Sequence, residues 1–154
     1  MYRKILVPLD GSELAECVFP HINKVIKSSE KTEVILFRVC EPPVLLADYP
    51  SDLRPRWEEH VKQETAHTQQ QCRLYLDDTE KRLQQAGVNV RTESGLGNPA
   101  ELIVDYATKN QVDLIIIASH GRSGIMRWAF GSTADKILRA SPVPVMVVKC
   151  TSGK

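Results

Sequence analysis

Three glycines, Gly121, Gly124 and Gly131, lie in one short segment and give the clearest chemical signal in the chain. The segment, SHGRSGIMRWAFGST at residues 119–133, follows an apolar run that predicts a strand and leads into a predicted helix. In α/β proteins, backbone N–H groups and a helix N-terminus converge on an anion at such a place. The segment therefore predicts a binding site for a phosphate-bearing ligand, with a nucleotide as the first candidate.

Polar side chains in the segment suit the same ligand. Ser132 and Thr133 could donate hydroxyl hydrogen bonds, and Arg122 could neutralise phosphate charge or remain solvated. Ser132 and Asp135 also have the spacing of a helix capping box, which is compatible with anion binding at the same helix end. The glycine spacing and position match neither a P-loop nor a dinucleotide-binding fingerprint.

Two more polar residues follow predicted strands at the same sheet edge. Asp10 could accept hydrogen bonds from a ribose or an adenine amine, or it could instead cap the following helix. His120 could bind a phosphate or a ribose. No acid or nucleophile is identifiable as its partner, so the sequence predicts no catalytic residue.

The elements that must position these residues alternate along the chain. Apolar runs predict strands at 5–7, 34–40, 88–93, 112–119 and 142–148. Helical spacing and caps predict one helix from Asp10 or Ser12 to about residue 29, kinked at Pro20, and others at 57–86, 98–110 and 132–140. This order predicts an α/β fold with a doubly wound, five-stranded parallel sheet and helices on both faces. We expect one domain at 1–150 and a short tail at 151–154.

Prolines mark two further segments. Four prolines between 42 and 55 exclude regular helix or central strand there, which predicts a long surface loop with a lid or partner-contact role. Pro144 places the last predicted strand at a sheet edge. An apolar edge strand invites pairing with another chain, so we expect a homodimer through this strand. The expected interface residues are Val143, Val145, Met146, Val147 and Val148.

The bulk composition limits the classes of partner. The chain has 154 residues, a net charge of +1 and 25% charged residues, which gives no global field toward nucleic acid or anionic membranes. No apolar run is long enough for a transmembrane helix or the core of a signal peptide. We therefore expect a cytoplasmic protein that binds neither nucleic acid nor membrane.

The cysteines are scattered singly, at 17, 40, 72 and 150. Their spacing gives no support for a zinc site or for dithiol redox chemistry. Cys17 and Cys40 lie in apolar patterns, which predicts reduced thiols in the core. Cys150 lies near the C-terminus and could be exposed and open to oxidation.

Several of these segments together resemble the universal stress protein family over essentially the whole chain. The matching segments are ILVPLDGS at 5–12, ASHGRSG at 118–124, GS at 131–132 and PVPVMVV at 142–148. The ATP-binding branch of that family has the pattern G-x-x-G, nine residues, then G-[ST]. The pattern falls on residues 118–132, with Ala118 in place of the first glycine.

The resemblance implies a Rossmann-like fold of the adenine nucleotide alpha hydrolase type and a site for ATP, AMP or another adenine nucleotide, with Mg²⁺ bound through the phosphates. Asp10 would contact the ribose or the base, and Val39 would contact the adenine. The resemblance also implies a homodimer through the last strand and a role in stress survival. The residues expected to bind ATP are Pro8, Leu9, Asp10, Val39, Ile117, Ala118, His120, Gly121, Arg122, Gly131, Ser132 and Thr133.

The leading functional hypothesis is a stress-response regulator that acts as a nucleotide-dependent homodimeric switch toward an unknown regulatory protein partner. Two alternatives stay open. One is a slow ATPase or phosphotransferase with Asp10 near the phosphates. The other is a dimeric interaction module without nucleotide binding, which the alanine at position 118 would support.

Overall fold

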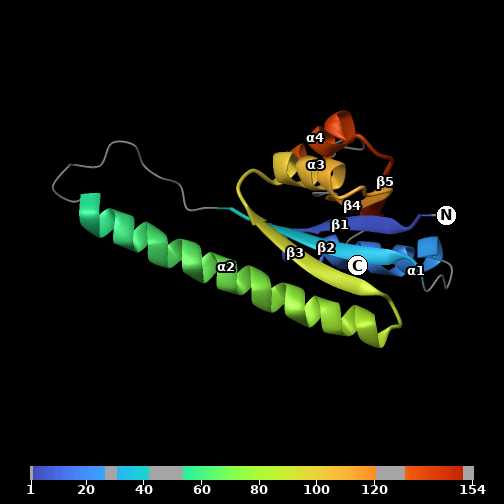
Figure 1. The fold of residues 1–154 in the computed structure, drawn as a ribbon, viewed down its shortest axis with the longest axis horizontal. Helices are drawn as coiled ribbons and strands as arrows, with labels where there is room; N and C mark the ends of the chain where they lie inside the picture. The colour runs from blue at the N-terminus through green and yellow to red at the C-terminus, as the bar shows by residue number, and fades with distance from the viewer. Residues whose placement is uncertain (1, 27–30, 42–53, 121–130, 151–154) are drawn as a thin grey trace.

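A parallel sheet forms the centre of the molecule. The computed structural model describes residues 2–26, 31–41, 54–120 and 131–150. Within them the five-stranded sheet has the order β3-β2-β1-β4-β5 (Figure 1). This arrangement confirms the predicted α/β fold with a doubly wound sheet. The strands are β1 (Lys4–Leu9), β2 (Glu33–Cys40), β3 (Val90–Leu96), β4 (Leu114–His120) and β5 (Val145–Cys150).

Helices cover both faces of the sheet. On one face lie the 3-10 turn η1 (Ala15–Val18), α1 (Phe19–Ile26) and α2 (Arg54–Gln85), and on the other lie α3 (Pro99–Lys109) and α4 (Ser132–Ala140) (Figure 1). We call these the α1/α2 layer and the α3/α4 layer. Among the helices that the structure describes, none combines the length and the apolar character needed to cross a membrane.

Alternation of side chains along each strand produces two apolar cores. Ile5 and Val7 of β1 pack in the core of the α1/α2 layer, whereas Leu6 packs in that of the α3/α4 layer. All three side chains are fully buried. Burying an aliphatic side chain contributes about 1.5–3 kcal/mol, so a strand buried on both faces must be apolar at nearly every position. The parity of a strand residue therefore decides which layer its side chain meets.

Local polar contacts shift several element boundaries from their predicted positions. The single helix predicted from Asp10 or Ser12 is wrong, because η1 precedes α1 and Pro20 lies in the first turn of α1, where a missing N–H costs little. The third strand begins at Val90 because the N–H of Val88 donates to the carbonyl of Leu83 at the end of α2 (3.1 Å). The last strand begins at Val145, after a turn in which Ser141 Oγ donates to the carbonyl of Val143 (2.7 Å).

The cysteines require the largest correction to the sequence analysis. Cys17 is bonded to Cys150 and Cys40 to Cys72, with Cα–Cα distances of 5.8 and 6.4 Å. Both distances lie in the range that a disulfide spans. The predicted reduced thiols at Cys17 and Cys40 are therefore wrong, and Cys150 is buried rather than exposed. The partners are 133 and 32 residues apart in sequence, and only the fold brings them together.

Candidate functional site

The strand order changes direction between β1 and β4. β2 and β3 follow β1 on one side of the sheet, and β4 and β5 lie on the other side. In open α/β sheets, ligands bind outside the carboxyl ends of the strands at this switch point. Asp10 directly follows β1 at this edge, and the backbone of His120 ends β4 beside it. The fold thus brings together the two strand ends that the sequence analysis selected.

The predicted site residues on the strands divide between the two layers. Val39 and Ile117 pack in the α3/α4 layer, and Pro8 lies on that same side of β1 by alternation from Leu6. Leu9 and Ala118 point into the core of the α1/α2 layer. A ligand on the α3/α4 side could meet these last two residues only through their backbone.

An open cavity of about 450 Å³ lies on the α3/α4 side of this edge. Of the residues predicted to bind ATP, Thr133 lines it. The sequence analysis missed its other polar side chains. The lining consists of Glu41 after β2, Gly97 and Asn98 in the turn between β3 and α3, Pro99 and Ala100 at the start of α3, and Thr133 and Lys136 of α4.

Signals for the missed residues are weak in the sequence. The sequence around Asn98 predicts only a helix cap, and its side chain does accept a hydrogen bond from the N–H of Glu101 (3.3 Å). Lys136 lies three residues after Thr133, so the two share a face of α4. Glu41 follows β2 with no motif around it. Polar side chains near helix starts are common on protein surfaces. These residues can be assigned to one site only because they line the same cavity.

Among the described residues, no side chain caps the N-terminus of α4. Gly131 is the cap residue, so the predicted capping box on Ser132 is wrong: Ser132 is already the first helical residue. Gly131 has φ −55°, and a Cβ built there would meet no atom of the described residues within 4 Å. Neither the backbone nor the packing of the described residues therefore demands a glycine. The open space next to the first N–H groups of a helix suits an anion.

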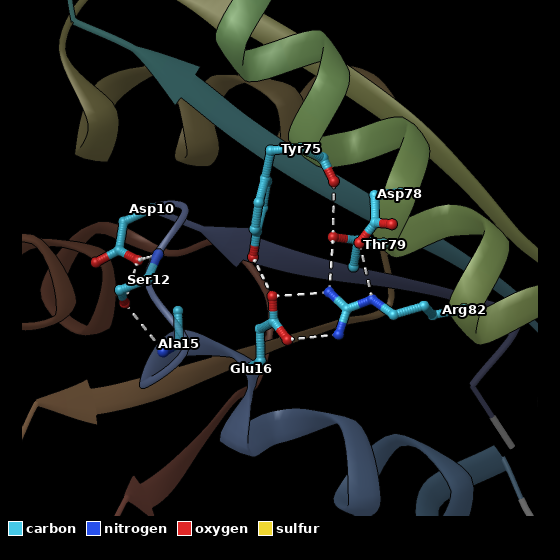
Figure 2. Close-up of polar contacts among 8 residues, drawn as sticks. All are labelled: Asp10, Ser12, Ala15, Glu16, Tyr75, Asp78, Thr79 and Arg82. Carbon is cyan, nitrogen blue, oxygen red and sulfur yellow. Dashed lines mark hydrogen bonds and ion pairs between the residues drawn. The ribbon is translucent and has the colours of Figure 1, made fainter.

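Asp10 organises the loop that follows β1. Its Oδ1 accepts hydrogen bonds from the N–H (2.9 Å) and the hydroxyl (2.6 Å) of Ser12, and Ser12 Oγ accepts one from the N–H of Ala15 (3.2 Å) (Figure 2). Gly11 has φ +85°, a conformation that glycine adopts without strain. The predicted role of Asp10 as a helix cap is wrong, because its carboxylate closes a turn with Ser12 and η1 begins after Leu14 without a side-chain cap. A carboxylate has several acceptor positions, so ribose binding remains compatible with this turn.

Glu16 of η1, the element that follows this loop, contacts α2. The hydroxyl of Tyr75 donates to Glu16 Oε1 (3.0 Å), and Arg82 donates to both carboxylate oxygens (2.9 Å each) (Figure 2). Burial and the adjacent Glu16 carboxylate raise the pKa of the Tyr75 phenol, which keeps it a hydrogen-bond donor. The element that follows the loop at the switch point is therefore held by a charged contact with α2.

Three predicted residues cannot be placed in the site by their side chains. Gly121 and Arg122 lie outside the described residues, and for His120 only the backbone is described. Within the described parts of the chain, no group of three or more His, Cys, Asp or Glu residues is arranged to hold a metal ion.

A family comparison decides what kind of protein has this site. Residues 1–149 match the model of the universal stress protein family. The chain belongs to the universal stress protein family. Universal stress protein MJ0577 from Methanocaldococcus jannaschii is 32% identical over 156 residues, which cover 97% of this chain and 96% of that protein. The solved structure of MJ0577 covers 99% of both chains, with a TM-score of 0.79 and 30% identity. The resemblance inferred from the sequence is confirmed.

Two other solved members of the family hold adenine nucleotides. One is a universal stress protein family protein from Arabidopsis thaliana with AMP bound, with a TM-score of 0.65, 16% identity and coverage of 97% of this chain and 92% of that one. The other is a universal stress protein in complex with cAMP, with a TM-score of 0.64, 18% identity and coverage of 97% and 98%. At these identities the likeness shows a shared fold.

Replacing Glu16 with glutamine tests the contact between α2 and η1. We expect the free energy of unfolding to fall by about 1–2 kcal/mol, because hydrogen bonds to a charged group contribute more than neutral ones. Urea unfolding measures this change. Asp78→Asn is the matched control: Asp78 pairs with the same Arg82 (3.1 Å) but is 72% exposed, so its loss should cost less than about 0.5 kcal/mol. Equal losses in the two variants would contradict the anchoring role of Glu16.

Proposed function

We propose that this universal stress protein binds an adenine nucleotide, first of all ATP, and that binding switches how its homodimer contacts a regulatory partner under stress. The observation that carries the proposal is the open cavity at the carboxyl edge of the sheet, beside the N-terminus of α4, where the cap residue is a glycine. The AMP-bound and cAMP-bound members of the family, which share the fold, support an adenine nucleotide as the ligand.

Charge and donor placement suggest how the nucleotide would lie. The backbone N–H groups at the start of α4 and the hydroxyls of Ser132 and Thr133 would face the phosphates. Lys136 would add a positive charge at the cavity wall. The ribose and adenine would extend toward Asp10 and Val39, at the ends of β1 and β2. Mg²⁺ would be bound through the phosphates.

Ala118 does not favour the alternative of an interaction module without nucleotide binding. Its methyl packs in the α1/α2 layer, away from the cavity, and its backbone lies within β4 without a positive φ. An alanine fits such a position in a strand without strain. The departure from the family glycine therefore gives no steric reason to expect a lost site.

Gly131→Ala tests the proposed position of the phosphates. The Cβ would meet no atom of the described part of the chain and the φ suits alanine, so we expect the thermal unfolding midpoint to stay unchanged. A bound phosphate would approach this backbone closely, so we expect calorimetric titration to show ATP binding weakened about tenfold or more, a loss of about 1.4 kcal/mol or more. Unchanged affinity in a variant of unchanged stability would contradict phosphate binding at Gly131.

Ala118→Gly tests whether the departure from the family motif obstructs the ligand. We expect no gain in ATP affinity, because the methyl lies on the other face of the sheet. Stability should fall by about 1 kcal/mol, because a buried methyl is lost and the unfolded strand gains freedom. Calorimetric titration and urea unfolding measure the two effects. A clear gain in affinity would show that the methyl limits binding.

The homodimer of this proposal would form through β5, and the protein would act in the cytoplasm. β5 lies at one edge of the described sheet, and its Val145, Met146 and Val147 are only half-buried.

Met146→Lys tests this interface. Sedimentation should show a dimer for the wild type, and the variant should shift toward monomer because a charge would be buried in the interface. Lys149→Gln, at an exposed position of the same strand, should leave the dimer intact. A wild-type monomer, or a Met146→Lys dimer of unchanged strength, would contradict this interface.

A further inference from the structure

A disulfide joins the middle of α2 to the last residue of β2. Cys40 and Cys72 are 3% and 2% exposed, and their Cα atoms are 6.4 Å apart. The bond closes a sequence separation of 32 residues and crosses from a helix of the α1/α2 layer to the sheet. In the cytoplasm, the location in the proposed function, disulfides are usually transient and catalytic or redox-sensing, which favours a regulatory role for this pair.

Cys72 is the first buried residue along the described part of α2, counted from its N-terminus. The helix packs on the sheet through Cys72, Leu76, Thr79 and Leu83, which are all buried. No residue from 55 to 71 of the same helix is buried. Figure 1 shows this half of α2 extending past the sheet. The disulfide therefore lies where the attached half of the helix gives way to the half without buried contacts, and local opening there would expose the sulfurs.

Cys40 is also part of the framework of the cavity. Its carbonyl oxygen accepts a hydrogen bond from the N–H of Gly97 (3.2 Å), and Gly97 lines the cavity. The next residue, Glu41, lines the cavity as well, and the preceding residue, Val39, packs in the α3/α4 layer. A shift of Cys40 would therefore move two cavity-lining residues directly: Gly97 through the hydrogen bond and Glu41 through the peptide bond.

We propose that the Cys40–Cys72 pair is a reversible thiol–disulfide switch that sets the affinity of the cavity for its nucleotide. The inference rests on the proposed nucleotide site. In the oxidised state the bond holds the end of β2 against α2 and keeps Glu41 and Gly97 in their binding positions. In the reduced state the end of β2 keeps its pairing with β3 but loses its bond to α2, so its position is less restricted. Part of the binding free energy then goes into restoring the binding position.

The chemistry needs a small-molecule disulfide such as oxidised glutathione. One cysteine thiolate attacks a sulfur of that disulfide and releases one thiolate, which leaves a mixed disulfide. The second cysteine thiolate then attacks the protein sulfur, forms the Cys40–Cys72 bond and releases the second thiolate. The protein loses two protons and two electrons, and the co-reactant becomes two thiols. An excess of the small thiol drives the same two exchanges in reverse.

ATP titration in defined glutathione buffers tests the switch. Mass spectrometry of alkylated samples gives the oxidised fraction of each cysteine pair, and calorimetry gives the Kd for ATP. We expect the Cys40–Cys72 bond to open and close with the thiol-to-disulfide ratio and the reduced protein to bind ATP about tenfold more weakly, within the range usual for linked sites. The amide of Gly97 should exchange hydrogen faster in the reduced protein.

The second disulfide provides the matched control. Neither Cys17 nor Cys150 lines the cavity. The pair Cys17→Ser with Cys150→Ser should therefore keep the redox response of ATP binding, and the pair Cys40→Ser with Cys72→Ser should abolish it. If the latter variant does not fold, the wild type in reducing and oxidising buffers still decides.

The outcomes separate the switch from the nucleotide site. ATP binding of equal affinity in both redox states, or a Cys40–Cys72 bond that never forms or never opens, would overturn the switch alone. No ATP binding in either state would overturn the proposed function, and the coupling with it.

Discussion

The parallel pairing of β1 with β2 on one side and β4 on the other is the constraint on which the rest of the structure depends. The registers Ile5↔Val34 and Ile5↔Leu114 align all three strands at one buried position. Parallel strands send every carboxyl end to the same edge and require right-handed crossovers, which place α1 and α2 on one face and α3 and α4 on the other. The loop after β1, the turn before α3 and the start of α4 therefore meet at one edge, and the cavity lies between them on the α3/α4 side.

The sequence predicted those features that depend on interactions between residues close together in the chain. The start of α3 was predicted from Asn98, Pro99 and Glu101, because a cap depends only on residues within one turn. The capping of α4 was misplaced by one residue, because the backbone of Gly131, rather than a side chain, forms the cap. The direction of the Ala118 methyl could be assigned only after the strand gave its parity. The disulfides and the charged cavity wall at Glu41 and Lys136 depend on contacts between distant segments, which spacing along the chain does not encode.

The two layers have different roles at the site. The α3/α4 layer lines the cavity and provides a helix N-terminus that suits an anion, whereas the α1/α2 layer holds neighbouring backbone segments in place. The two contacts are Glu16 of η1, which follows the loop after β1, and the Cys40–Cys72 bond at the end of β2. A change in how α2 lies on the sheet would therefore reach the site through η1 and through the end of β2. This arrangement offers a physical route by which a universal stress protein could couple its ligand to its surroundings.

Backbone amide chemical shifts during an ATP titration test most directly whether the nucleotide binds on the α3/α4 side of the carboxyl edge. Our account predicts shifts centred on Gly97, Asn98, Thr133 and Lys136, with smaller shifts at Asp10 and Val39. The buried stretch of α2 from Cys72 to Leu83 should change little in the oxidised protein. Shifts centred on that stretch of α2, or no shifts at a large excess of ATP, would contradict the proposed site.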